Sequence, residues 1–127
     1  MHNGTIPNMK RILLIEDTEE IRENVAEILE LHSYHIIAAC DGLQGLHLAL
    51  EHLPDVIICD VKMPKMTGFE LLAVLRGKPE TAGIPFIFIS ASAQKSDIEK
   101  GRESGAFAYL TKPFTSDDLL RLVRNVT

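Results

Sequence analysis

Short, unbroken runs of apolar residues recur along this 127-residue chain and constrain its fold more than any other feature. Each run is bounded by charged or turn-forming residues. A run this short that is apolar throughout is typical of a strand buried on both faces, as in a parallel sheet. The expected strands are Ile12–Ile15, Ile36–Cys40, Val56–Cys59, Pro85–Ile89 and Ala106–Leu110.

The segments between these runs have the pattern of amphipathic helices. Their apolar residues recur every three or four positions, which places them on one face, toward a core. Residues that favour helix N-termini precede most of these segments. The first expected helix is capped by Asp17 or Thr18 and turns Ile21, Val25, Ile28 and Leu29 toward the core, and the second is capped by Asp41 and turns Leu43, Leu46 and Leu50 inward. The third opens at Thr67, stops at Gly77 and has Leu71, Leu72 and Leu75 on its core face. The last has a capping-box-like start at Thr115–Asp118 and has Leu119, Leu122, Val123 and Val126 on its core face.

The segment from Ser96 to Ser104 has the weakest helical pattern. Ile98 is its only large apolar residue, and Gly101 lies inside it. Weak burial lowers local stability, so we expect motion to concentrate in this segment.

Strands that alternate with helices predict an α/β domain with a parallel sheet and right-handed crossovers. The flavodoxin-like strand order 2-1-3-4-5 suits a chain of this size and gives a (βα)5 three-layer sandwich in which the first and third strands are neighbours. We expect one domain over residues 10–127. Residues 1–9 contain Gly, Pro and Asn without periodicity and are expected to form a flexible tail.

Composition narrows the class of protein. The formal net charge of −5 argues against a nucleic-acid groove, which needs a basic patch. No apolar run reaches membrane-spanning length, and the N-terminus lacks the apolar core of a signal peptide. Cys40 and Cys59 each follow an apolar run and are expected to be small buried hydrophobes, not a disulfide or a metal-binding pair. Free cysteines favour a cytoplasmic setting.

Polar residues stand where the expected strands end. The first strand runs into Glu16 and Asp17, the third into Asp60, the fourth into Ser90, and the fifth is followed by Lys112. Carboxyl ends of parallel strands share one edge of a sheet, and open α/β sheets bind ligands there. In the expected strand order, three carboxylates, a hydroxyl and an ammonium therefore share one rim.

These residue types suit phosphoryl chemistry. Crowded carboxylates repel one another, and protonation or a divalent cation relieves that repulsion. An oxygen-lined site with few protein ligands suits Mg²⁺. Asp60 is then a candidate nucleophile toward phosphorus, with Lys112 and Ser90 to hold the phosphoryl oxygens. Each residue alone could equally be a cap or a surface ion-pair partner; only their joint occurrence at strand ends favours a site.

Four sequence motifs stand at these strand ends, namely ILLIED (residues 12–17), DVKMPKMTG (60–68), ISA (89–91) and YLTKPF (109–114). In this order, over Lys10 to Val126, they resemble the receiver domain of two-component response regulators, including the chemotaxis-regulator type. The segment 60–68 is the most specific of the four.

The resemblance implies a role for each matching residue. Asp60 would accept a phosphoryl group from a phosphohistidine. Asp17, Asp60 and the backbone carbonyl of Lys62 would be Mg²⁺ ligands, with Glu16 acting through metal-bound water. Lys112 would be the ammonium that binds the phosphoryl group. Ser90 would be the switch hydroxyl and Tyr109 the switch aromatic. Ala91 would be the small residue that leaves the site open. The family usually has a cis peptide before the position of Pro113.

The resemblance also implies the function. The domain would be a phosphoacceptor that catalyses only its own phosphorylation and dephosphorylation, not an enzyme acting on other substrates. Its phosphodonor would be a sensor histidine kinase or a histidine phosphotransfer protein. Its output would pass to a downstream protein or effector domain, or to phosphorylation-dependent dimerisation, through the face of the fourth helix, fifth strand and fifth helix. No direct contact with nucleic acid or membrane is expected.

Three rival classes fit the residues less well. A flavodoxin-like electron carrier would need a phosphate-cradling first loop, whereas the loop here is Glu16 to Glu20, which repels phosphate unless a metal is bound. A haloacid-dehalogenase-like phosphohydrolase would need a second aspartate where Lys62 stands. A receiver that cannot be phosphorylated would lack part of the acidic, hydroxyl and ammonium set. The effect of Lys62 and Ser92 on the phosphoryl lifetime stays open, with a solvated loop lysine the alternative for Lys62.

Overall fold

The computed structural model describes residues 9–127, which form five parallel strands in the order β2-β1-β3-β4-β5 and five helices. Strands and helices alternate along the chain, which confirms the predicted flavodoxin-like architecture. The elements are β1 (Arg11–Ile15), α1 (Glu19–Leu31), β2 (His35–Ala39), α2 (Gly42–His52), β3 (Val56–Asp60), α3 (Gly68–Arg76), β4 (Phe86–Ser90), α4 (Lys95–Glu103), β5 (Ala108–Thr111) and α5 (Ser116–Val126).

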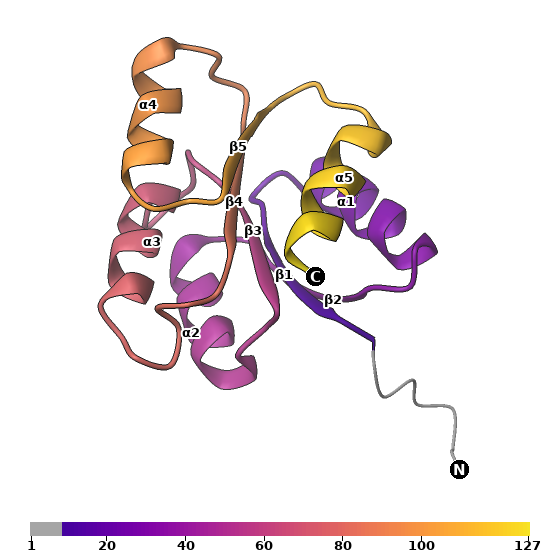
Figure 1. Ribbon diagram of the computed structural model, residues 1–127, viewed down its shortest axis with the longest axis horizontal. Coiled ribbons are helices and arrows are strands. Elements are labelled where there is room, and N and C mark those ends of the chain that lie inside the picture. The colour runs from indigo at the N-terminus through magenta and orange to yellow at the C-terminus, as the bar shows by residue number, and fades with distance from the viewer. Residues whose placement is uncertain (1–8) are drawn as a thin grey trace.

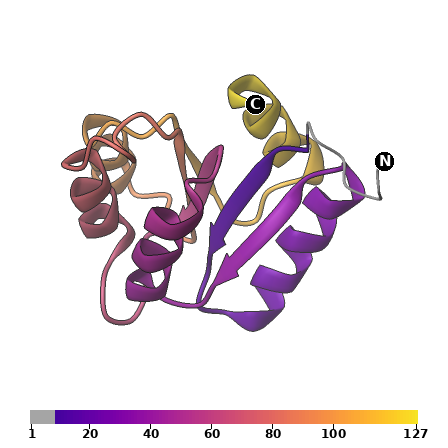
Figure 2. The ribbon, with the colours of Figure 1, turned by 90° about the horizontal axis from the view of Figure 1, so that it is seen from below.

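The molecule has three layers. Helices α1 and α5 cover one face of the sheet, and α2, α3 and α4 cover the other (Figure 1). Alternate residues of β1 enter the two cores, with Leu13 and Ile15 on the α2–α3 side and Ile12 and Leu14 on the α1–α5 side. The view along the sheet separates these two layers of helices (Figure 2). The central strands are therefore buried on both faces, as their unbroken apolar sequences require.

Helix α2 packs through its small residues, and the prediction for this helix is wrong in part. Leu46 packs against the core as predicted, but Leu43 and Leu50 are 49% and 37% exposed. The residues of α2 that are buried are Gly42, Gly45 and Ala49. The helix lies so close to β1 that a Cβ at Gly45 would lie 2.5 Å from Cδ1 of Ile15. Glycine and alanine permit this approach, which larger side chains would block.

The cysteines differ from each other. Cys59 is buried in β3 as predicted, but Cys40 is exposed, and neither forms a disulfide. The prediction for Cys40 is wrong because β2 is an edge strand and Cys40 lies just beyond its end. An apolar run on an edge strand is covered less completely than one in the middle of a sheet.

The remaining helices begin as the sequence predicts. Thr18 and Asp41 are the N-cap residues of α1 and α2, and Thr67 and Thr115 close capping boxes with Glu70 and Asp118. In α5 the buried residues are Leu119, Leu120 and Val123, with Leu122 and Val126 only partly buried. Within residues 9–127, no helix is both long and apolar enough to cross a membrane. Apart from Met9, the predicted tail lies outside the described residues.

Candidate functional site

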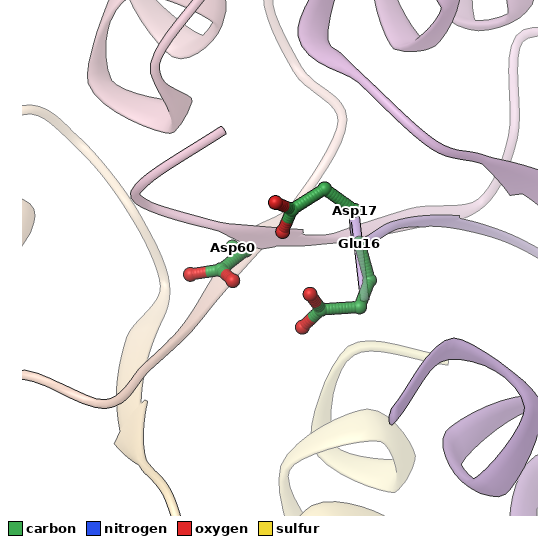
Figure 3. Close-up of side chains that lie close together, drawn as sticks. All are labelled: Glu16, Asp17 and Asp60. Carbon is green, nitrogen blue, oxygen red and sulfur yellow. The ribbon is translucent and has the colours of Figure 1, made fainter. Parts of the chain in front are cut away.

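Three carboxylates meet at the carboxyl-terminal edge of the two central strands. Glu16 and Asp17 follow β1, and Asp60 is the last residue of β3, the strand paired with β1. One oxygen from each carboxylate lies within 4.8 Å of the others. Figure 3 shows the three side chains turned toward one another. The strand order brings together residues that lie 44 positions apart in the chain, because Ile15 pairs with Cys59 in register.

Lys112 lies between two of these carboxylates. Its Nζ donates to Oε1 of Glu16 at 2.7 Å and to Oδ2 of Asp60 at 3.1 Å. Glu16 is fully buried and Asp60 is only 8% exposed, so both contacts are shielded from water. Burial alone would lower the pKa of the Lys112 ammonium, but its hydrogen bonds to Glu16 and Asp60 outweigh burial and raise that pKa above its usual value.

Asp17 differs from the other two carboxylates because it is exposed. Partial burial, followed by the hydrogen bond and negative charge of Glu16, raises the pKa of Asp17 above its usual range. No lysine or arginine forms a salt bridge with Asp17 in the part of the chain that the structure describes. Ionised Asp17 therefore adds negative charge that the protein alone does not balance.

Ser90 stands beside Asp60 at the end of the next strand, β4, and is 2% exposed. A pocket of about 420 Å³ opens over both residues. Lys62 and the segment 91–94 line the rest of this pocket, and the Lys62 side chain is exposed. The predicted residues Asp60, Ser90 and Lys62 thus share one cavity.

Tyr109 contacts the loop after β4 and the core. Its ring packs near Phe88, with 6.1 Å between centroids, and its hydroxyl donates to the carbonyl of Ser92 at 2.9 Å. The Lys112–Pro113 peptide bond is cis, as the family resemblance implied. All of the predicted side chains therefore lie at one end of the sheet, with Tyr109 at its periphery.

Sequence reasoning missed several residues that support the site. Nη1 of Arg22 donates to the backbone carbonyl of Glu16 at 2.8 Å, and the backbone N–H of Thr18 donates to Oε2 of Glu16 at 3.1 Å. Ser92, for which the sequence suggested only an effect on the phosphoryl lifetime, makes hydrogen bonds to Ser90, Asp97 and Tyr109. No local sequence signal identifies these partners, because each bond depends on how loops fold back at the rim.

The fold and this rim define a class of flavodoxin-like α/β domains with an acidic site at the end of the central strands. The response regulator receiver domain model matches residues 12–124. The chain therefore belongs to the response regulator receiver domain family. Receiver domains act in two-component signalling, in which response regulators interact with kinases and downstream effectors.

Known proteins resemble the chain along most of its length. The DNA-binding dual master transcriptional regulator RpaA of Synechocystis sp. is 40% identical over 116 residues, covering 91% of this chain and 48% of RpaA. The chain thus spans about half the length of several curated relatives. The chemotaxis response regulator CheY4 of Vibrio cholerae is 32% identical with a TM-score of 0.88, covering 94% of this chain and 100% of CheY4.

A second solved structure is informative about the site. It is the receiver domain of sensor histidine kinase PA1611 from Pseudomonas aeruginosa, which has a magnesium ion coordinated in its active-site cleft. It is 26% identical to this chain with a TM-score of 0.87, and the match covers 93% of this chain and 97% of that one.

Proposed function

We propose that this domain accepts a phosphoryl group on Asp60 from a phosphohistidine of a sensor histidine kinase or phosphotransfer protein. The observation that carries the proposal is the position of Lys112, which binds Asp60 and Glu16 at the same time. A surface salt bridge would need one carboxylate, whereas this ammonium lies between two buried ones beside a third. Such an arrangement suits a site through which a charged group passes.

The acidic residues fit a divalent cation. Glu16, Asp17 and Asp60 offer oxygen ligands only, as hard cations such as Mg²⁺ prefer, and Asp17 has no cationic partner of its own among residues 9–127. The receiver domain of PA1611 holds magnesium in the corresponding kind of cleft. Asp17, Asp60 and the Lys62 carbonyl would be ligands, with Glu16 acting through water. Bound Mg²⁺ would neutralise charge on the transferring phosphoryl oxygens.

The chain's own residues account for the rest of the chemistry. An oxygen of the Asp60 carboxylate attacks phosphorus, an O–P bond forms, and the N–P bond to the donor imidazole breaks. The Lys112 ammonium remains close enough to Asp60 to bind a phosphoryl oxygen. The Ser90 hydroxyl, from a residue that lines the same pocket as Asp60, is the second donor. Ala91 leaves the pocket open because its side chain is short. The domain thus acts on itself alone.

A groove beside Lys112 is a suitable docking place for the phosphodonor. It has a volume of about 590 Å³ and lies between α1 and the segment that leads into α5. Ile28, Leu31 and Phe114 make its wall apolar, and Leu31 is 74% exposed. Because Lys112 lines the same groove, a helix seated there would lie next to the phosphorylation site. The occupant we propose is the helix that carries the phosphohistidine.

The proposed output is a change at the face formed by α4, β5 and α5. Ser90 is drawn toward the phosphoryl group, and Tyr109 turns with the loop that it contacts. The partners are a downstream protein or effector domain, or a second copy of the domain. A net charge of −5 supports signalling by protein contact, without direct binding of this domain to nucleic acid. We propose a cytoplasmic setting with no direct membrane contact.

The test is intact mass after incubation with acetyl phosphate and Mg²⁺. Wild type should gain one phosphoryl group that hydroxylamine removes, as it does from acyl phosphates. Asp60→Asn should gain none. Asp117→Asn changes an exposed aspartate in the first turn of α5 and is the matched control, so it should label like wild type. Unchanged labelling of Asp60→Asn would refute the proposal.

The docking groove has its own test. Leu31→Gln should slow transfer from a phosphohistidine phosphotransfer domain that labels wild type, while labelling by acetyl phosphate stays unchanged. Glu30→Gln alters the neighbouring exposed residue, which does not line the groove, and serves as the control. Equal transfer rates for Leu31→Gln and wild type would place the donor elsewhere.

A further inference from the structure

Ser92 connects the end of β4 to three other parts of the molecule. Its N–H donates to Oγ of Ser90 at 3.1 Å, and its carbonyl accepts from the Tyr109 hydroxyl at 2.9 Å. Its own hydroxyl donates to Oδ2 of Asp97, in the first turn of α4, at 2.5 Å. It also accepts a longer bond of 3.4 Å from the N–H of Gln94. One residue thus contacts the proposed switch hydroxyl, the proposed switch aromatic and the start of α4.

Helix α4 depends on Ser92 because it has no side-chain cap of its own. Its N-cap residue, Gln94, makes no side-chain hydrogen bond to the first turn. By contrast, α2, α3 and α5 are all capped by their N-cap side chains. The Ser92 hydroxyl accepts from the N–H of the N-cap residue, Gln94, and donates to the carboxylate of Asp97 within the first turn. It therefore bridges the N-cap residue and the first turn of α4, where a capping box would join them directly.

Burial does little to hold α4 in place. Gly101 is the one buried residue of α4, and a glycine contributes no side chain to the core. With so little apolar anchoring, polar bonds at the first turn carry a larger share of what positions the helix. The Ser92–Asp97 bond is the shortest of those bonds.

The bond from Ser92 to Ser90 links this attachment to the site. In the structure the Ser90 oxygen accepts from the Ser92 N–H, and it lies in the pocket with Asp60. A Ser90 hydroxyl that turns toward a phosphoryl group on Asp60 would leave that N–H without its partner. The Ser92 backbone must then move, and its side chain carries the first turn of α4 with it through Asp97.

We propose that Ser92 is the positioning residue that joins the phosphorylation site to α4, through the hydrogen bond from its hydroxyl to Asp97. The proposal has two parts. The first is that Ser92 attaches α4, and it concerns the unphosphorylated protein alone. The second is that Ser92 transmits the signal to α4, and this part rests on the proposed function of Asp60. Ser92 itself takes no part in bond making or breaking.

The first experiment measures attachment without any phosphoryl group. Amide hydrogen exchange over residues 95–100 should be about five- to tenfold faster in Asp97→Ala and Ser92→Ala than in wild type, since one hydrogen bond is lost. Ser92→Thr keeps the hydroxyl and should exchange like wild type. Ser96→Ala removes an exposed hydroxyl from the same turn and is the matched control. The double variant Ser92→Ala/Asp97→Ala should be no faster than either single variant, as expected for two partners in one bond.

The second experiment measures transmission. Beryllofluoride, which mimics the phosphoryl group, should shift the amide resonances of residues 95–103 in wild type. In Asp97→Ala these shifts should fall to less than about half, while acetyl phosphate labels Asp60 at the wild-type rate. Full-sized shifts in α4 of Asp97→Ala, or exchange as slow as wild type in the first experiment, would overturn the proposal. Failure of wild type to be labelled would refute the function of Asp60 instead and leave the exchange result unaffected.

Discussion

Helices α3 and α4 have the same length and cover the same face of the sheet, but they are held in different ways (Figure 1). Helix α3 begins with a capping box and buries Leu71, Leu72 and Leu75. Helix α4 has no side-chain cap from its N-cap residue and buries only Gly101. Each buried leucine contributes about 1.5–3 kcal/mol of transfer free energy, so the two helices differ greatly in anchoring.

The difference matches their relation to the site. The N–H of Gly68, at the start of α3, donates to the Val61 carbonyl at 2.8 Å and fixes the loop that follows Asp60. Helix α4 follows the loop after Ser90, and its Gly101 lies against the ring of Tyr109. A firmly packed helix therefore holds the acceptor loop, while a loosely packed one adjoins the proposed switch residues. Low local stability is what a moving element requires.

The largest expected effect compares apolar truncations in the two helices. Leu72→Ala should lower the free energy of unfolding by about 2–5 kcal/mol, since it leaves a cavity in the core. Ile98→Ala removes a side chain that is only partly buried and should lower it by less than about 1 kcal/mol. Urea unfolding gives both values. Equal losses would show that α4 is anchored as firmly as α3 and would break the comparison.

The next largest effect on stability is expected from replacing the buried glycine of each helix by alanine. A Cβ at Gly68 would collide with the backbone carbonyl of Asp60, so Gly68→Ala should cost about 1–3 kcal/mol and disturb the site. A Cβ at Gly101 would lie 2.8 Å from Cδ2 of Tyr109, a ring that can turn aside. Gly101→Ala should therefore change stability little, because alanine also favours the helix, while the Tyr109 ring moves. Unfolding curves measure the stability of both variants, and the Tyr109 ring resonances show whether the ring moves in Gly101→Ala. Unchanged ring resonances would mean that α4 shifts instead.

Removing the N-cap side chain of each helix should give a smaller difference in stability between α3 and α4. Thr67→Ala removes the capping box of α3 and should cost about 1 kcal/mol. Gln94→Ala removes an N-cap side chain that makes no bond to α4, so stability should stay within a few tenths of a kcal/mol. Thermal unfolding of both variants measures the difference. A loss at Gln94 as large as that at Thr67 would contradict the view that Ser92, and not the Gln94 side chain, attaches the start of α4.

Much of the fold could be predicted from the sequence because two signals agree. Unbroken apolar runs identified the buried strands, and threonine or aspartate with following acids identified the helix starts. Prediction failed in part at α2, where Leu46 packs against the core but Leu43 and Leu50 do not, and the small residues make the closest contact. Close approach of a helix to a sheet depends on backbone position, which hydrophobic periodicity does not encode.

The candidate site was predictable to a similar degree and for a similar reason. Glu16, Asp60 and Ser90 stand directly at strand ends, so strand order alone brings them together. The partners Arg22 and Asp97 were not predictable, because a helix and a loop must fold back before these side chains meet the rim.

The smallest expected effect is that of changing Asp17. This change tests whether the charge of the carboxylate site can alter without moving α4. The pKa of Asp17 is raised by partial burial and then by Glu16, so the folded state binds this proton more tightly than the unfolded state does. Ionised Asp17 therefore lowers stability at neutral pH, and this penalty disappears as the pH falls through the raised pKa.

Asp17→Asn should accordingly raise the unfolding temperature slightly at pH 7 without Mg²⁺, and the gain should vanish in acid. Added Mg²⁺ should stabilise wild type but not Asp17→Asn, because the cation needs that carboxylate. Amide exchange in α4 should stay the same throughout, since Asp17 has no bond to the loop after Ser90 among the contacts of residues 9–127. Faster exchange in α4 upon Mg²⁺ binding alone would show that the metal, and not the phosphoryl group, already moves this helix.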